Sequence, residues 1–332
     1  MRNHIFSIMK VFSFGFTLVM LHMLLLSCSK NGSTPGETTP VDTIANKPAL
    51  SGRLVYHSYS CYECNDSKMY LYDFSTNTNK VLSNGWDMLN PMNAHFSPDG
   101  KKIVFMGVNK TTSQWDIFLY DFASNEVPVN LTTSLPAAKN EDPKFSSDGL
   151  SIICKRNGKL ARMDTTGKIT AEYTVPGADA SMPYFSNDGK YILYAASQED
   201  ISSIYSYDID NNTIQTLYTA SGIYAYYPIV LNDTSFVFTR WHSASNHHDQ
   251  LYIGYYKAQT PFRLGCNEPT GDYSDGCPAG SKYIILSSTR SGGIGGYDLY
   301  ITDVTTGAIW TLNKYNQVIN SSGNELGASY HE

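Results

Sequence analysis

The chain has 332 residues, of which 42% are hydrophobic and 16% charged, and its formal net charge is −6. This balance is typical of a globular protein and is too apolar for a disordered one. An acidic chain without a basic run is a poor surface for nucleic acid or anionic lipid headgroups, so neither is expected as a partner.

Residues 1–28 have the pattern of a targeting segment. Arg2 and Lys10 give a positive start, and residues 11–26 form a mostly apolar run that ends at Ser27 and Cys28. The run is short for a membrane span. The segment resembles a bacterial lipoprotein signal, in which Cys28 would carry the lipid and begin the mature chain. An ordinary cleaved signal with a chance cysteine is the alternative.

Residues 29–48 are polar and rich in Pro, Gly and Thr, which predicts a flexible tether. We therefore expect contact with the membrane only through the N-terminal lipid. No acidic cluster follows Cys28, which resembles lipoproteins that face the periplasm. The expected location is the bacterial cell envelope, on the periplasmic side of the outer membrane. Residues 49–332 are long enough for one large domain.

A short repeat organises that domain. The sequence Ser-Pro-Asp-Gly at 97–100 returns as Ser-Ser-Asp-Gly at 146–149 and Ser-Asn-Asp-Gly at 186–189, with decayed copies near 232 and 279. The copies lie about 45 residues apart. Each follows a short strand pattern and precedes an apolar one, so each predicts a hairpin turn. A Tyr-rich third strand and a fourth strand complete each unit.

Four strands in each period predict an all-β fold, a β-propeller. The first unit lacks an inner strand, because the tether runs up to its second strand at 53–58. Residues 324–330 have the pattern of an inner strand and would supply the missing one. The expected architecture is a six-bladed propeller closed by the C-terminal strand, with the other inner strands near 92–97, 141–146, 181–186, 226–231 and 271–277.

These turns, the Asp-hydrophobic-Tyr strands and the segment 287–300 (SSTRSGGIGGYDLY) resemble TolB-type propellers built of WD-like repeats. The resemblance covers residues 51–332. It implies six blades and a binding or scaffolding role, here towards an envelope protein or a glycan, without a cofactor. Similar repeats occur in oligogalacturonate lyases, so a metal-dependent enzyme acting on polysaccharides is the alternative. The chain contains no Gly-x-Ser-x-Gly elbow, so a peptidase is not expected.

The topology predicts which face carries a site. Turns between strands 1–2 and 3–4 of each blade share one face and are short. Connections between strands 2–3 and between blades share the other face and are irregular, as binding loops on rigid scaffolds are. The expected ligand face carries aromatic side chains and one histidine: Tyr59, Tyr62, Trp86, Trp115, Tyr224, Tyr226, Trp241 and His242. The alternative is that these rings only pack loops onto the blades.

Metal sites have little support in the sequence. His247, His248 and Asp249 are the nearest to a ligand cluster, but adjacent residues of a strand point to opposite faces. Asp249 aligns with Asp116 and Asp298, which predicts a structural role at the start of a third strand. The position of Glu141 aligns with Met92, Ser181, Tyr226 and Asp272, so no ring of carboxylates is expected. An enzyme would need two or three histidines to converge with a carboxylate, from His57, His95, His242, His247 and His248.

The chain has six cysteines. In an exported protein, cysteines pair where geometry allows. Cys61 and Cys64 share a loop and form the first candidate disulfide, and Cys266 and Cys277 form the second. Cys154 lies in an apolar strand and is expected to be a free thiol in the core.

Overall fold

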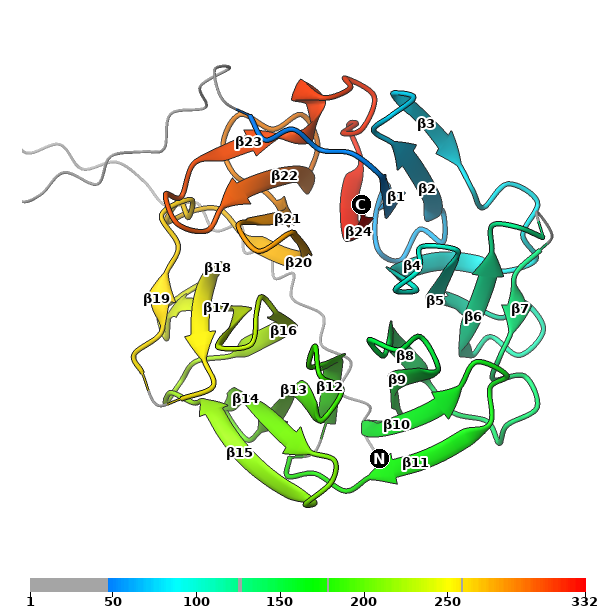
Figure 1. The fold of residues 1–332 in the computed structure, drawn as a ribbon. Helices are drawn as coiled ribbons and strands as arrows, with labels where there is room; N and C mark the ends of the chain where they lie inside the picture. Colours follow the sequence, from blue (N-terminus) through cyan, green and yellow to red (C-terminus); the bar gives the residue numbers. More distant parts are fainter. Residues whose placement is uncertain (1–46, 125–126, 178, 258) are drawn as a thin grey trace, which may run out of the picture. The chain divides into compact units, whose positions relative to one another are not determined.

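The computed structural model describes residues 47–332 except 125–126, 178 and 258. The expected signal, with Cys28, and nearly all of the expected tether lie outside these residues. The described chain forms six four-stranded antiparallel sheets placed as blades around an axis, as expected (Figure 1). No helix among the described residues is long and apolar enough to span a membrane.

Blades 1 to 3 contain these strands, from the axis outwards. Blade 1 has β24 (Asn324–His331), β1 (Arg53–Tyr59), β2 (Lys68–Asp73) and β3 (Thr78–Val81). Blade 2 has β4 (Leu89–Phe96), β5 (Lys102–Val108), β6 (Trp115–Asp121) and β7 (Val129–Asn130). Blade 3 has β8 (Asn140–Phe145), β9 (Ser151–Arg156), β10 (Lys159–Asp164) and β11 (Ile169–Tyr173).

Blades 4 to 6 follow the same order. Blade 4 has β12 (Asp179–Phe185), β13 (Tyr191–Gln198), β14 (Ile201–Asp208) and β15 (Thr213–Tyr218). Blade 5 has β16 (Ala225–Val230), β17 (Ser235–Ser243), β18 (Asn246–Tyr255) and β19 (Phe262–Arg263). Blade 6 has β20 (Tyr273–Ala279), β21 (Tyr283–Ser288), β22 (Asp298–Asp303) and β23 (Ile309–Thr311), followed by the 3-10 helix η1 (Leu312–Lys314).

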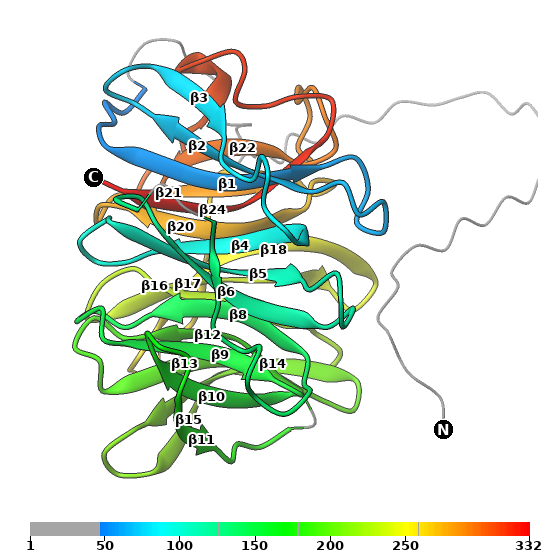
Figure 2. The ribbon, with the colours of Figure 1, turned by 90° about the vertical axis from the view of Figure 1, so that its right-hand side faces the viewer.

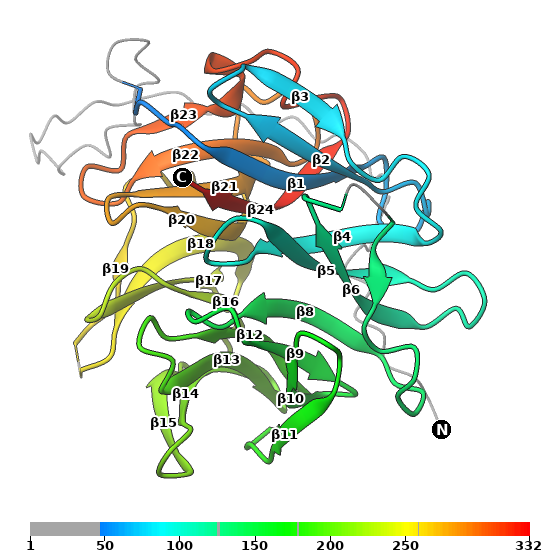
Figure 3. The same cartoon turned by 45° about the vertical axis from the view of Figure 1, so that its right-hand side comes forward.

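The C-terminal strand closes the ring, as the sequence predicted. β24 pairs antiparallel with β1, with Arg53 opposite His331 and Ser58 opposite Glu325 (Figure 3). The first blade therefore takes its inner strand from the end of the chain and the other three from its start. Closure removes the open edge that a linear array of blades would expose to aggregation.

The repeated turns are held by the side chains that define them. Ser97 donates its hydroxyl proton to Oδ1 of Asp99 at 2.7 Å, and the same oxygen accepts the backbone N–H of Lys101 at 3.0 Å. The backbone N–H of Lys102 donates to the hydroxyl of Ser97 at 2.9 Å. Gly100 has φ of 67°, a conformation that costs glycine little. The pattern Ser-x-Asp-Gly therefore specifies the hairpin locally.

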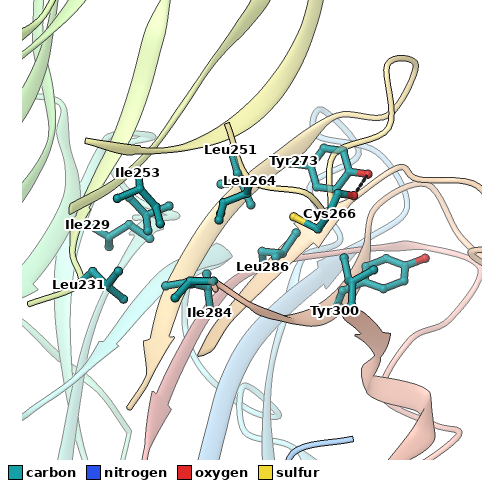
Figure 4. Packing of buried hydrophobic residues seen from close by; sticks show 13 residues of the cluster. Ile229, Leu231, Leu251, Ile253, Leu264, Cys266, Tyr273, Ile284, Leu286 and Tyr300 are labelled. Carbon is teal, nitrogen blue, oxygen red and sulfur yellow. Dashed lines mark hydrogen bonds between the residues drawn. The ribbon is translucent and has the colours of Figure 1, made fainter. Parts of the chain in front are cut away.

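The hydrophobic core is divided among the contacts between neighbouring blades. Each of six clusters combines residues from two adjacent blades, such as Leu251 of blade 5 with Leu286 of blade 6 (Figure 4). Middle strands are buried on both sides, which explains why β5, β17 and β21 each contain an uninterrupted apolar stretch, at 103–106, 236–238 and 284–286.

The two ends of the strands form two faces. We call the turn face the side that carries the short turns between the first and second strands of a blade, at 97–101, 146–150, 186–190 and 231–234. We call loop face the opposite side, with the connections at 60–67, 109–114, 264–272 and 289–297 (Figure 2). Residues 242–248 are part of the long β17–β18 hairpin of this face, in which Ser243 pairs with Asn246.

Candidate functional site

A channel follows the propeller axis, and a repeated backbone irregularity shapes it. Besides Asn90 near the start of β4, each inner strand is interrupted by a register shift and places one residue at positive φ beside the axis. These residues, one per blade, have φ between 47° and 60°: Gly327, Asn93, Asp142, Met182, Tyr227 and Asp275. All six line a cavity of about 50 Å³ on the axis. Such strained positions concentrate at functional sites.

Three ionisable side chains meet at this ring. Burial raises the pKa of Asp142, and the charge of Glu141 adds to the effect. Burial together with the charge of Asp142 raises the pKa of Asp275 to about 6. Burial lowers the pKa of Lys144, although both aspartates act in the opposite direction. Desolvation therefore outweighs the mutual attraction of these groups, and each favours its neutral form more than it would in water.

Two histidines near the axis are neutral hydrogen-bond acceptors. Nδ1 of His57 accepts the backbone N–H of Asn93 at 3.4 Å, and Nδ1 of His95 accepts that of Phe145 at 3.1 Å. Burial, with the charge of Lys144, lowers the pKa of His57 to about 3 and that of His95 well below its ordinary value. These rings bind neighbouring blades together and do not titrate near neutral pH.

On the loop face, aspartates and tyrosines of blades 5 and 6 form an acidic, tyrosine-rich group that we call the mouth. Burial raises the pKa of Asp249 to about 7, and the charges of Asp272 and Asp275 contribute. Burial and then the charges of the same three aspartates raise the pKa of Tyr297. Burial and Asp249 likewise raise the pKa of Tyr226. Carboxylates and phenols from blades 5 and 6 therefore share one electrostatic environment.

Asp249 does not have the structural role that its sequence alignment predicted. Asp116 lies opposite Gly107 of its second strand, and Asp298 lies opposite Ser288 of its own. The equivalent position in blade 5, opposite Arg240, is held by Gln250. Gln250 therefore takes the buried position, where its amide donates to the carbonyl of Gly271 at 2.8 Å. A shift of one residue moves a side chain to the other face of a strand, which brings Asp249 to the mouth.

A column of aromatic rings lies beside this mouth on blade 5. The ring centroids of Tyr224 and Trp241 are 4.5 Å apart, and those of Trp241 and His247 are 3.9 Å apart in a stacked arrangement. Tyr226 lies 6.1 Å from Tyr224. Tyr224 and Trp241 are half-buried, so part of each ring remains accessible. Here the structure groups three of the residues predicted for the ligand face.

The remaining predicted residues divide between surface and core. Tyr59 and Tyr62 make an edge-to-face pair at 6.3 Å on blade 1, and Tyr62 is 55% exposed. His242 is half-buried at the end of β17, with Nδ1 lacking a hydrogen-bond partner among the described residues. Trp86 does not belong to the ligand face. It is 8% exposed and stacks on Phe105 at 5.0 Å, because its segment folds back between blades 1 and 2.

Trp115 also packs against the core. It begins β6 and packs, half-buried, against the cluster shared by blades 2 and 3. For Trp86 and Trp115 the structure therefore follows the alternative given above, in which rings hold loops onto the blades.

One of the two predicted disulfides is formed. Cys61 and Cys64 form a disulfide with their Cα atoms 5.2 Å apart. Cys266 and Cys277 are buried free thiols, so the second predicted disulfide is not formed. Cys266 packs in the cluster between blades 5 and 6, whereas Cys277 packs in the one between blades 6 and 1. A whole blade thus separates them. Cys154 is a buried free thiol, as expected.

No group of three or more His, Cys, Asp or Glu residues suitable for a metal ion occurs in the described part of the chain. His248 instead pairs with Asp272, with Nδ1 to Oδ1 at 3.2 Å, and His247 stacks on Trp241. His57 and His95 lie on blades 1 and 2, whereas the other three histidines of the enzyme alternative belong to the β17–β18 hairpin.

Sequence reasoning missed the residues at the centre of the channel. The alignment placed Glu141 on the axis, but Glu141 is paired with Lys139 at 2.7 Å and Lys155 at 3.5 Å. The axial position belongs to the next residue, Asp142, and in blade 6 to Asp275. The signal was present as an acidic residue three positions before each of Phe145 and Pro278, but the bulge shifts the register of every inner strand.

Six blades around an axial channel, closed by the last strand, define a β-propeller of the closed-ring class. The model of the TolB beta propeller domain matches residues 25–253, which is more than half of the chain. The chain therefore belongs to the TolB beta propeller family. A search of curated proteins gave no match.

Solved structures share the fold at low sequence identity. Hydrazine synthase of Kuenenia stuttgartiensis matches with a TM-score of 0.66 and 15% identity over 84% of this chain and 46% of that one. TolB from Acinetobacter baumannii matches with a TM-score of 0.65 and 17% identity over 84% of this chain and 66% of that one. This chain thus spans less than two thirds of either relative.

A third structure differs in how its ring ends. The β-propeller domain of the trilobed protease from Pyrococcus furiosus matches with a TM-score of 0.51 and 17% identity over 80% of this chain and 82% of that one. That domain is described as having an open velcro topology, whereas β24 pairs with β1 here.

Proposed function

We propose that this chain is a lipid-anchored binding or scaffold propeller of the bacterial cell envelope, and that its loop face takes a protein or glycan partner. The observation that carries the proposal is the stacked column of Tyr224, Trp241 and His247 beside the acidic mouth of the channel. Partly exposed stacked rings offer a flat apolar platform with polar edges, which suits a sugar ring or a peptide side chain.

Polar groups suited to orient a partner lie next to the rings. Asp249 has an Oδ1 atom without a hydrogen-bond partner among the described residues, and Asp272 accepts from the backbone N–H of Asp249 at 2.9 Å. Carboxylate oxygens accept hydrogen bonds from sugar hydroxyls and from peptide or lysine N–H groups. An aromatic platform beside a few acceptors combines affinity with orientation.

The described chain enters the propeller at the turn face. Tyr330, near the end of β24, donates its hydroxyl proton to the carbonyl of Ser51 at 2.7 Å, and the backbone N–H of Phe74 donates to the carbonyl of Gly52 at 3.0 Å. Both contacts lie at the turn face. A tether that ends there, with a lipid on Cys28, would hold the propeller from the side opposite to the loop face.

The test compares matched variants of the two faces. Trp241→Ala and Tyr224→Ala remove rings of the column, while Leu150→Ala removes a side chain that is 70% exposed on the turn face. Each full-length protein is used to capture material from envelope fractions of cells that make it, and to probe an array of envelope glycans. A partner that binds the parent and the Leu150 variant, and binds both ring variants at least tenfold more weakly, supports the proposal.

A partner bound equally by all four proteins would contradict a role of the column in binding. The anchor is tested separately with Cys28→Ser. This change is expected to move the protein from the membrane fraction to the soluble periplasmic fraction, and an unchanged distribution would refute the lipid anchor.

A further inference from the structure

A second cavity continues the axial channel towards the turn face. Its volume is about 280 Å³, and it is lined among others by His95, Lys144, Tyr184, Asn187 and Ser329. This far exceeds the roughly 10–15 Å³ that one water molecule needs on the same measure. Asn187 belongs to an exposed turn between β12 and β13, so the cavity opens on the turn face, away from the aromatic column.

Lys144 carries the positive charge of this cavity. No aspartate or glutamate is among the described residues that line it. No hydrogen bond or ion pair joins the Lys144 ammonium to another described residue. Asp142 and Asp275 act on it only through longer-range attraction, and burial still lowers its pKa. The ammonium is therefore incompletely compensated, and an anion in the cavity would stabilise its charged form.

The neutral groups around Lys144 are also donors. Nδ1 of His95 accepts a backbone N–H, so the neutral ring carries its proton on Nε2, which lies 3.4 Å from the hydroxyl of Tyr184. His95 therefore donates to that hydroxyl, and Tyr184 keeps its own proton to donate. The hydroxyl oxygen of Ser329 accepts the backbone N–H of Phe96 at 3.1 Å, and its own proton has no acceptor among the described residues.

Apolar walls complete the cavity, with Val230, Leu231, Pro278 and Ala328 beside the polar groups. One ammonium surrounded by neutral donors matches a single negative charge, and these walls suit a short hydrocarbon segment next to it. A phosphate dianion is usually held by several cations or by a nest of backbone N–H groups. The single cation therefore favours a carboxylate.

We propose that the turn-face end of the axial channel binds a monocarboxylate, with the carboxylate against Lys144 and its apolar segment against Val230 and Leu231. The carboxylate belongs either to a short free acid or to the C-terminal end of a peptide, which share this chemistry. The site is separate from the loop face and does not depend on the function proposed above.

The first test uses the unaltered full-length chain and needs no variant. Propionate and propionamide are titrated against the protein by calorimetry and by ligand-observed NMR. They have nearly the same shape, so binding of propionate at an affinity at least tenfold above that of propionamide supports the site. A tetrapeptide with a free C-terminus and the same peptide as a C-terminal amide form a second pair. Binding by the free peptide without propionate binding would assign the site to a chain end.

The second test removes the charge. Lys144→Met keeps most of the side-chain volume, and Lys101→Met is the matched control, because Lys101 is an exposed lysine of the turn face. Loss of one charged hydrogen bond predicts a dissociation constant about 10–100 times higher for Lys144→Met and an unchanged one for Lys101→Met. Equal binding of acid and amide forms, or unchanged binding by Lys144→Met, would overturn the proposal.

Discussion

The contact between β24 and β1 gives a sharp prediction, because it is crowded at one glycine. Gly327 has φ of 60°, and a methyl group there would lie 2.5 Å from Nδ1 and 2.6 Å from Cε1 of His57. The other five inner strands place a side chain at the same left-handed position. The need for glycine in blade 1 therefore comes mainly from the histidine opposite it.

Two terms set the expected loss of stability for Gly327→Ala. Placing a non-glycine residue at positive φ costs about 1–2 kcal/mol. Overpacking against the imidazole adds about 1–3 kcal/mol. Gly85→Ala is the matched control, since Gly85 has φ of 82° and nothing within 4 Å of the added methyl group. The control is expected to lose only the backbone term.

The assay is urea unfolding followed by circular dichroism for the two single variants, His57→Ala and the double variant Gly327→Ala/His57→Ala. Removing the ring gives the methyl group room, so the double variant should be more stable than the sum of the single losses by about 1–3 kcal/mol. Strict additivity, or equal losses for Gly327→Ala and Gly85→Ala, would refute this explanation of the glycine.

Three further predictions concern the site and the core. The raised pKa of Asp249, about 7 against an ordinary 3.8, means that the folded chain keeps a proton that the unfolded chain releases in this range. The free energy of unfolding should therefore fall as pH rises from about 4 to 7, and Asp249→Asn should flatten that slope in a pH series of urea melts. Reduction of the Cys61–Cys64 disulfide should lower stability by about 2 kcal/mol, as expected for so short a loop, and a larger loss would show that blade 1 depends on it. Trp86→Ala should lower stability by about 3–5 kcal/mol without affecting partner binding, whereas weaker binding in the folded variant would return Trp86 to the ligand face.

The sequence predicted the blades because their signals are local. The turn at 97–100 is specified by Ser97, Asp99 and Gly100 through contacts within six residues. Uninterrupted apolar stretches in the middle strands predict that these strands are buried. Even closure was predictable, because the first unit lacked one strand and the C-terminal segment had the pattern of one.

The channel could not be read in the same way. Its geometry depends on a bulge in every inner strand, and one extra residue moves the axial position from Glu141 to Asp142. A shift of one residue likewise exchanged Asp249 with Gln250. Trp86 is buried because its loop folds back between two blades, and no local sequence pattern predicts that packing. Register and loop packing are properties of the assembled ring.

We propose that the loop face is the surface that meets a partner. A photo-crosslinking amino acid placed at Tyr62, which is 55% exposed on the loop face, tests it most directly against one placed at Leu150, which is 70% exposed on the turn face. In cells that make the protein, we expect a discrete crosslinked species from position 62 that disappears in the Trp241→Ala background, and none from position 150. The same species from position 150 alone would contradict it.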